Sequence, residues 1–220
     1  MRAERASGTR EVILATAERL FAEHGVYAVS NRQISEAAGQ GNNTAVGYHF
    51  GSKADLVRAI ARRHSERIEL IRTRMVERVP EDARVRDWVA CLVRPVVLHL
   101  AELPAPTWFA RFAAQIMTDP ALRLIMTEEG LSTPAVHQIL HGMQTCLPGL
   151  PADVRAERYE MAGQLLVHIC ALRERALAEG APTPRRTWPD AATGLVDAIE
   201  GMWLADVTPT HTTADPIRSS

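Results

Sequence analysis

Residues 30–57, SNRQISEAAGQGNNTAVGYHFGSKADLV, contain the pattern that decides the fold of this chain. Two short stretches of helical spacing are separated by the glycine-containing turn GQG. Ser30 is followed three residues later by Gln33, and Ser52 is followed three residues later by Asp55. A serine with such a partner can form a capping box, in which each side chain bonds the backbone N–H of the other residue. Two helices are therefore expected to begin at these serines.

The front of the chain is expected to hold three helices. Apolar residues at helical spacing predict a helix over roughly 10–23, which Gly25 would end. Two short helices follow, over about 30–38 and 43–49. Such a group, with a glycine-containing turn between the second and third helices, is typical of a helix-turn-helix whose third element enters the major groove of DNA. From spacing alone, a plain three-helix packing motif remains an alternative.

The rest of the chain is expected to be all-α as well. A fourth helix is predicted over 53–79, and prolines or glycines separate the helical segments behind it. Those segments lie near 82–103, 106–118, 120–129, 133–147, 152–179 and 187–205. We therefore expect an N-terminal helix-turn-helix domain over 1–52 and a larger C-terminal helical domain over 53–206. The tail, 207–220, has no core-forming pattern and is expected to be disordered.

Charge is distributed unevenly along the 220 residues, whose formal net charge is −1. Residues 1–74 hold 12 Lys and Arg against 8 Asp and Glu, whereas residues 75–220 hold 13 against 18. The mildly basic front can face a polyanion and the acidic rear cannot, although so modest an excess is more often an ordinary solvated surface.

Three further observations bear on where the protein works. The three cysteines are odd in number and lie in apolar helical patterns, which is typical of reduced, buried thiols. The N-terminus has no apolar signal-peptide core, and no apolar run approaches the length of a membrane span. The sequence predicts a cytoplasmic protein without a membrane partner.

The segment REVILATAERLFAEHGVYAVSNRQISEAAG, with YHFGSKADLV behind it, resembles the DNA-binding domain of the tetracycline-repressor (TetR) family of bacterial transcription regulators. The shared features cover about residues 10–57: a first helix ending RLFAEHG, the second helix ISEAAG, the YHF triplet, and a Ser-Lys-x-x-Leu entry to the fourth helix. The rear two-thirds resemble the family only in general organisation: they are all helical, are interrupted by prolines and end in two long helices. The resemblance implies a homodimer on a roughly palindromic operator, and a C-terminal helical domain that often encloses a small-molecule site and releases DNA on ligand binding.

The third helix carries the candidates for base recognition. Asn43 and Thr44 stand at its start, where an amide can bond adenine bidentately and a threonine can offer a hydroxyl or a methyl. Gly47 costs about 1 kcal/mol relative to Ala in a helix. It is explained either by close approach of the backbone to DNA or by relief of a clash with the first helix. From Gly39 to YHF the chain is one residue longer than the commonest family pattern, which leaves two registers open.

Other side chains are candidates for phosphate contacts. The resemblance assigns the Tyr48 hydroxyl to a phosphate, and His49 either to a phosphate or to packing. Lys53, the only lysine, lies in the first turn of the fourth helix, where a cation opposes the helix dipole unless an anion is near. Arg32 is a further candidate, although an exposed arginine is commonly only solvated. Three N-terminal arginines could form a weaker arm along the DNA: Arg2, Arg5 and Arg10.

The rear domain offers candidates for an apolar effector site with a histidine as its polar handle. They are Trp88, His99, Trp108, Phe109, Phe112 and Met143. For any one of them, ordinary core is the commoner explanation. His137 and His141 stand four residues apart on one helix, but no Cys or carboxylate lies at ligand spacing nearby, so no metal and no cofactor is predicted.

Apolar stripes on the last two helices predict a homodimer through a four-helix interface. The residues are Met161, Leu165, His168 and Leu172 in the first of them, and Leu195, Ile199, Met202 and Trp203 in the second.

The sequence thus predicts a ligand-responsive transcriptional repressor. An enzyme is disfavoured, because the chain has no nucleophile elbow, zinc-protease motif or phosphate-binding loop. The alternative is an architectural or division-control DNA-binding protein on the same fold without a ligand. A closed apolar cavity in the rear domain would favour the repressor, and a solid core would favour the alternative.

Overall fold

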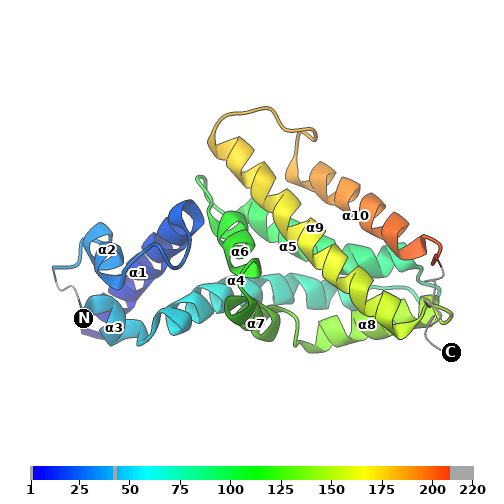
Figure 1. Cartoon of the computed structure of the whole chain (residues 1–220), viewed down its shortest axis with the longest axis horizontal. Coiled ribbons are helices and arrows are strands. Elements are labelled where there is room, and N and C mark those ends of the chain that lie inside the picture. Colours follow the sequence, from blue (N-terminus) through cyan, green and yellow to red (C-terminus); the bar gives the residue numbers. More distant parts are fainter. Residues whose placement is uncertain (1, 42–43, 209–220) are drawn as a thin grey trace, which may run out of the picture.

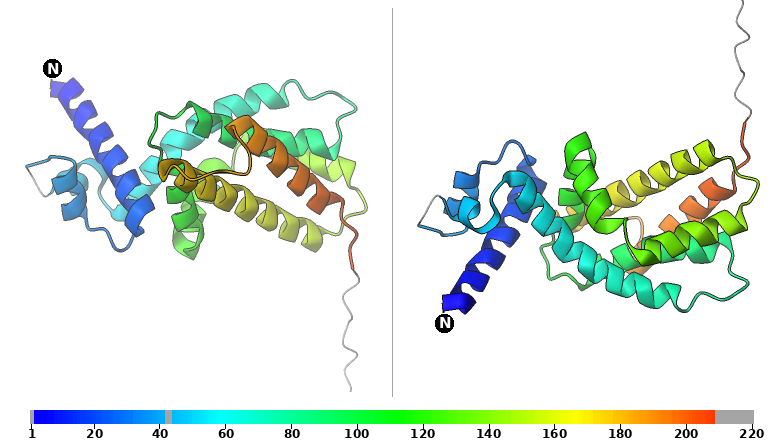
Figure 2. Two further views of the ribbon diagram at one scale, coloured as in Figure 1. Left: turned by 90° about the horizontal axis from the view of Figure 1, so that it is seen from above. Right: turned by 90° about the horizontal axis from the view of Figure 1, so that it is seen from below.

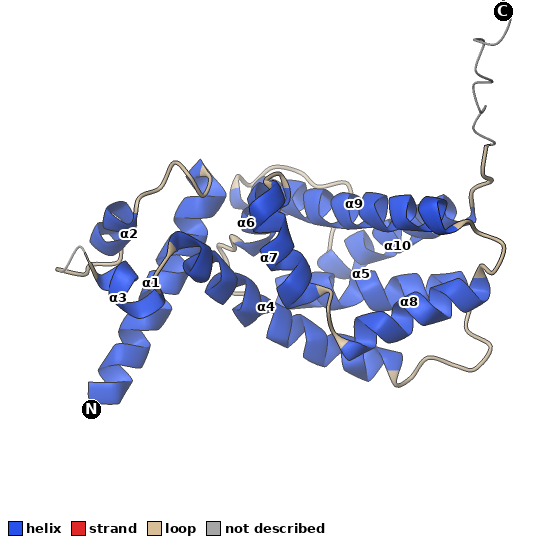
Figure 3. Ribbon diagram, turned by 60° about the horizontal axis from the view of Figure 1, so that its bottom comes forward, coloured by secondary structure: helices blue, strands red, loops and turns tan. Residues whose placement is uncertain are grey.

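The structure is a computed structural model that describes residues 2–41 and 44–208, with the side chains of the first few residues left out. Within those ranges the chain forms ten helices and no strand (Figure 3), so the all-α prediction is confirmed. The helices are α1 (Arg2–His24), α2 (Asn31–Ala37), α3 (Ala45–Phe50), α4 (Lys53–Val76), α5 (Val85–Glu102), α6 (Phe109–Met117), α7 (Pro120–Gly130), α8 (Pro134–Cys146), α9 (Ala152–Ala178) and α10 (Trp188–Leu204). No described helix combines the length and apolar character that a membrane span requires.

The helices are arranged in two groups along an elongated molecule (Figure 1). Helices α1, α2 and α3 gather at one end and are called the head below. Helices α5 to α10 form the other group, called the rear domain. Helix α4 begins beneath the head and continues into the rear domain, where it packs against α5, α7 and α8. Helices α9 and α10 run side by side on one side of the rear domain (Figure 2).

The ends of the head helices follow the signals in the sequence. The Ser30 side chain accepts from the Gln33 N–H at 3.2 Å, and the Ser30 N–H donates to Gln33 Oε1 at 2.8 Å. The second predicted capping box, between Ser52 and Asp55, is also formed. Gly25 adopts a φ of 85°, a left-handed conformation that favours glycine, and follows the last residue of α1. Local chemistry is therefore sufficient to place these boundaries.

The first helix is longer than predicted. It begins at Arg2 and not near residue 10, because the preceding segment is rich in Ala, Glu and Arg, which favour helix. The arginines assigned to an N-terminal arm, Arg2, Arg5 and Arg10, consequently belong to α1. Most of the predicted tail, from residue 209 onward, lies outside the described residues.

Helix α10 buries its apolar stripe inside its own chain. Leu195, Ile199 and Trp203 are 5%, 1% and 1% exposed, because α10 packs along α5. The prediction that these three side chains face a second copy was therefore wrong. Helical spacing identified the apolar face of α10 but could not identify which helix covers it.

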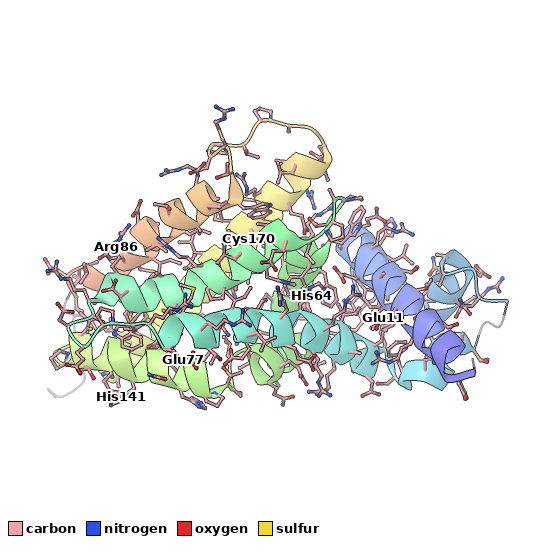
Figure 4. All side chains as sticks on the ribbon, turned by 180° about the vertical axis from the view of Figure 1, so that it is seen from behind. Glu11, His64, Glu77, Arg86, His141 and Cys170 are labelled. Carbon is pink, nitrogen blue, oxygen red and sulfur yellow. The ribbon has the colours of Figure 1, made fainter. Side chains whose placement is uncertain are left out.

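Three buried polar side chains connect the head with the rear domain. His64 Nε2, on α4, lies 2.9 Å from Glu18 Oε2 of α1, and His64 Nδ1 lies 2.7 Å from His99 Nε2 of α5. The ring of Phe109, from α6, stacks on His64 with 3.8 Å between ring centroids. Figure 4 shows His64 in the interior, where α4 passes its neighbours. Glu18, His64 and His99 are called the junction chain below.

Burial, and secondarily the neighbouring His64, lowers the pKa of His99 from 6.5 to about 4. In the unfolded chain His99 takes up a proton as the pH falls below 6.5, whereas the folded protein resists that protonation until about pH 4. The free energy of unfolding should therefore decrease as the pH is lowered. Between pH 6.5 and 4.5, His99 alone should lower it by about 2 kcal/mol.

Urea unfolding across that pH interval tests the effect. We expect His99→Gln, which has no titrating group at this position, to lose about 2 kcal/mol less than the wild type between pH 6.5 and 4.5. The same pH dependence in both proteins would show that His99 does not contribute to it.

Candidate nucleic-acid interface

Helix α3 divides its six residues between the core of the head and the solvent. Ala45 and Val46 are 8% and 0% exposed, whereas Tyr48 is 85% exposed. The half-buried ring of His49 meets Tyr48 edge-on, with 5.1 Å between ring centroids. The buried residues fix α3 in the head, and the exposed ones form a surface that a ligand can contact.

Gly47 lies on this exposed surface, and the described residues give no packing reason for a glycine there. Among them, no atom outside the backbone of α3 and the two neighbouring residues lies within 4 Å of the position that a Cβ would occupy. The explanation that Gly47 relieves a clash with α1 was therefore wrong. A glycine in a helix costs about 1 kcal/mol relative to alanine, and no close packing offsets that cost here. Close approach of the backbone to DNA at Gly47 therefore stays a prediction.

The other candidates for base recognition lie just before α3. The helix begins at Ala45, two residues later than predicted, and exposed Thr44 occupies the N-cap position. Asn43 lies outside the described residues, so both registers for the base-reading residues stay open.

Lys53 has a partner within the chain. Its Nζ donates to the backbone oxygen of Val29 at 2.7 Å. This bond ties the start of α4 to the loop between α1 and α2, and it explains a lysine in a first helical turn without any anion. An ammonium has three N–H donors, so a phosphate can share it with Val29. The phosphate contact of Lys53 therefore stays a prediction.

Arg32 is strongly exposed and pairs with Glu36 of the same helix at 2.7 Å. An exposed pair of this kind contributes little to stability. A phosphate can replace it at small cost, which keeps Arg32 among the candidates.

A groove of about 420 Å³ between α1 and α4, beside the end of α3, was not foreseen. Four arginines and three acids line it: Arg10, Arg58, Arg62, Arg63, Glu11, Asp55 and Glu66. Two of these arginines are held by α7, since Arg58 Nη1 donates to Glu128 Oε2 at 2.7 Å and Arg62 Nε donates to Glu129 Oε2 at 2.9 Å. The bond from Arg62 is the main reason why the pKa of Glu129 lies below its usual value. Because its cations are so paired, the groove is a poor anion site.

The six candidates for an effector site do not surround one cavity. His99 and Phe109 belong to the junction between head and rear domain, and Phe112 stacks beside Phe21 of α1 at 6.3 Å between centroids. Trp88 lies 11 residues before His99 on α5, roughly 16 Å along the helix.

The remaining members of that set lie elsewhere in the rear domain. The indole of Trp88 lies against Gly142 of α8 so closely that a Cβ there would overlap it, and Met143 beside it is 1% exposed. Trp108 is covered by the guanidinium of Arg111, 4.2 Å from the ring centroid. These side chains pack against neighbouring residues of the same chain, and this set does not line a common effector pocket.

A second hollow, of about 290 Å³, lies between the head and the turn from α6 to α7. Its lining includes His24 and Tyr27 from the head, and Gln115 and Asp119 from the rear domain. The Tyr27 hydroxyl donates to Asp119 Oδ2 at 3.2 Å. Neither hollow is lined by any of the six candidates above.

Helix α9 carries an exposed apolar stripe, called the α9 stripe below. It consists of Met161, Leu165, Ile169 and Leu172, at helical spacing. Met161, Ile169 and Leu172 are 46%, 39% and 64% exposed, and Leu165 is half-buried. The predicted dimer residue His168 is exposed beside them, and Met202 of α10 is half-buried. Contiguous exposed apolar side chains mark interaction surfaces.

Two family models match this chain. Residues 13–60 match "Bacterial regulatory proteins, tetR family", and residues 90–202 match "Tetracyclin repressor-like, C-terminal domain". The first match covers the head and the start of α4, and the second covers most of the rear domain.

The chain is also similar to two proteins named "HTH-type transcriptional repressor AcnR". It is 31% identical to the one from Corynebacterium efficiens over 120 residues, which is 54% of this chain and 57% of the relative. It is 30% identical to the one from Corynebacterium glutamicum over 92 residues, which is 40% of this chain and 48% of the relative. The chain thus spans about half the length of these relatives.

The fold matches a solved structure described as a putative TetR-family transcriptional regulator from Mesorhizobium loti MAFF303099. The TM-score is 0.50 at 16% identity, with 90% of this chain and 96% of that chain covered. At this identity the likeness concerns the fold alone.

The open space around Gly47 generates a test. We expect Gly47→Ala to raise the free energy of unfolding by up to about 1 kcal/mol, since alanine favours helix. The added methyl should nevertheless weaken binding to a DNA duplex that the wild type selects from a random-sequence pool. Chemical unfolding and fluorescence anisotropy measure the two effects.

Gly163→Ala is the control for the helix-propensity effect, because Gly163 also lies inside a helix with no described atom outside its own helix backbone within 4 Å of a Cβ. Since Gly163 lies on α9 between Met161 and Leu165 of the α9 stripe, the two variants are compared at protein concentrations at which sedimentation shows both to be dimers. Gly163→Ala should raise stability and leave DNA affinity unchanged. DNA affinity that is also unchanged in Gly47→Ala would show that DNA does not approach α3 at this position.

Proposed function

This chain belongs to the tetR family of bacterial regulatory proteins, and we propose that it is a ligand-responsive transcriptional repressor that binds a palindromic operator as a homodimer. The observation that carries the proposal is the exposed surface of α3, where Gly47 leaves open space and Tyr48 is 85% exposed. A helix of this kind fits the major groove of B-DNA. The names of the two similar proteins, both called repressors, support repression over activation.

Each candidate residue at or near this surface has a proposed role. Thr44 and Asn43 contact base edges at the start of α3, where hydroxyl, methyl and amide groups can read sequence. Tyr48 places its hydroxyl on a phosphate, and His49 and Lys53 hold the same backbone. Such phosphate contacts fix the position of the protein and carry no sequence information by themselves.

Dimerisation is proposed through the α9 stripe. Its apolar side chains lie next to a second helix, α10, whose outward residues include the small residues Ala198 and Gly201. Small residues allow a neighbouring helix to approach closely. Two copies related by a two-fold axis would form a four-helix interface here. The two heads would then have to lie about 34–36 Å apart to enter successive major grooves.

Helix α4 is the proposed lever for ligand response, because it contacts the head at one end and α5 and α8 at the other. A ligand changes DNA affinity only if it binds one arrangement of the two parts more tightly than the other. The hollow beside Tyr27 and Asp119 has walls from both parts, so a small molecule there could discriminate between arrangements.

Selection from a random-sequence duplex pool tests the DNA-binding part of the proposal. We expect the full-length protein to recover a palindromic consensus whose half-sites are centred about one helical turn apart. A boiled sample of the protein serves as the control. Recovery of no consensus, or of an asymmetric one bound by a single copy, would contradict an operator-binding homodimer.

The dimer surface has a direct test. Leu172→Glu should yield folded monomers in sedimentation, because a charge replaces an apolar side chain in the α9 stripe. Leu124→Glu is the matched control, since Leu124 of α7 is 63% exposed against 64% for Leu172. Ile199→Glu should instead unfold the chain, because it places a charge in the core. A Leu172→Glu protein that remains dimeric would exclude this surface.

The packing of the rear domain favours a second candidate, a DNA-binding protein on the same fold that uses no small ligand. Its observation is that the side chains expected to line an effector site are packed against other residues of the same chain. Adding the dialysable small-molecule fraction of the source cells to the protein–duplex complex separates the two candidates. Loss of binding supports the ligand-responsive repressor, and unchanged binding at cellular concentration favours the second candidate.

A further inference from the structure

The head contacts the rest of the molecule through polar interactions of two kinds. The pair between Tyr27 and Asp119 and the pair between Glu11 of α1 and Arg63 of α4 lie at the surface. The junction chain is different, because Glu18, His64 and His99 are 7%, 2% and 5% exposed. Water can replace the partners of the surface pairs, but it cannot enter the junction chain without a change in packing.

Both ring nitrogens of His64 take part in hydrogen bonds of the junction chain. Oε2 of Glu18 lies at hydrogen-bond distance from Nε2 of His64, so a single hydrogen joins these two atoms. His99, with its pKa lowered to about 4 chiefly by burial, is neutral at neutral pH. A single hydrogen therefore joins its Nε2 to Nδ1 of His64. Both nitrogens of the His64 ring are thus occupied, one by the head and one by the rear domain.

The rear domain also fixes the plane of the His64 ring. Phe109 of α6 stacks on it with an interplanar angle of 11°, and His99 meets it edge-on. The ring can therefore turn only if α5 or α6 moves. Conversely, if Glu18 is withdrawn with α1, its carboxyl group and Nε2 of His64 both lose their buried partner. An unpaired buried group of this kind is costly, so intermediate positions of α1 are disfavoured.

We infer that the junction chain is a latch that fixes the orientation of the head on the rear domain, with Glu18 as the positioning residue that sets the head for DNA binding. The latch itself follows from the buried contacts. Its consequence for DNA rests on the proposed function. Repacking of α5 or α6 around His64 would release Glu18. Through this contact, a change in the rear domain can alter the orientation of the head.

The charged groups around the latch offer controls. Arg67 of α4 and Glu102 of α5 form an exposed pair at 3.0 Å on the same two helices as the histidines. Glu23 stands on α1, close to Glu18 in sequence, but pairs with Arg19 at the surface. Glu102→Gln and Glu23→Ala therefore change charge on the same helices without touching the buried bonds.

Hydrogen exchange on the full-length protein tests the latch without DNA. We expect Glu18→Ala to speed exchange about tenfold in the C-terminal half of α1 and in α6, since an unpaired buried polar group favours opening of this junction by about that factor. Amides in α5 and α10, where these helices pack against each other, should be unchanged. Glu18→Gln, whose amide oxygen can still accept, should fall between Glu18→Ala and the wild type. Glu23→Ala and Glu102→Gln should match the wild type.

The outcomes separate clearly. Unchanged exchange in Glu18→Ala, or faster exchange spread evenly over all helices, would overturn the latch. If Glu18→Ala does not fold, Phe109→Leu provides the same test, because it removes the ring stacked on His64 and leaves no buried polar group unpaired. It should give the same local pattern of exchange in α1 and α6, and the wild-type pattern would overturn the latch.

Affinity for the duplex selected by the wild type tests the consequence for DNA. Glu18→Ala should bind that duplex about tenfold more weakly, because only the latched fraction of the heads is competent. Glu23→Ala should stay within about twofold of the wild type. Equal affinities for Glu18→Ala and the wild type would overturn the positioning role. If the wild type selects no duplex, the proposed function fails, and the exchange experiment still decides the latch.

Discussion

Helix α4 has to pack against two groups of helices at once, and the arrangement of the molecule follows from this constraint. Near its start, Leu56, Val57 and Ile60 are fully buried, and towards its end Ile68 and Val76 are buried as well. Its 24 residues span about 36 Å. A stiff element that is buried near both ends cannot adjust to one group of helices without moving against the other. The orientation of α3 toward any ligand is therefore tied to the packing of helices far from it.

The middle of α4 is where this constraint is met by polar groups. If apolar side chains stood at the positions of Glu18, His64 and His99, the head could rotate slightly against the rear domain, because apolar packing has little directionality. Hydrogen bonds of 2.9 and 2.7 Å in a buried site do not tolerate them. The polar junction costs desolvation, yet it defines one angle between head and rear domain. The exposed pairs of Arg58 and Arg62 with α7 add contact without that precision.

Sequence reasoning succeeded where the cause is local. The capping boxes at Ser30 and Ser52 and the glycine after α1 are set by residues within four positions of one another, and each lies where the pattern placed it. It failed where the cause is distant. Glu18 and His64 are 46 residues apart, and no periodicity connects them. For the same reason the stripe of α10 was assigned to a second copy, when α5 covers it. The start of α1 was missed because the segment before residue 10, although rich in residues that favour helix, carries no large apolar residues at helical spacing.

The anomalies in the sequence separate into two classes once their neighbours are known. Lys53 opposes the dipole of its helix, but the backbone oxygen of Val29 accounts for it, and the apolar stripe of α10 is accounted for by α5. Gly47 weakens α3 without close packing from other described residues, and the α9 stripe exposes three large apolar side chains. Where a residue departs from a local sequence preference and has a partner within the chain, that contact explains the departure. A departure without close packing among the described residues marks a candidate surface for a partner outside the chain. The exposed face of α3 and the α9 stripe are the two surfaces proposed for such partners, and they differ in chemistry. The first is polar, with a glycine that would allow close approach, and the second is apolar.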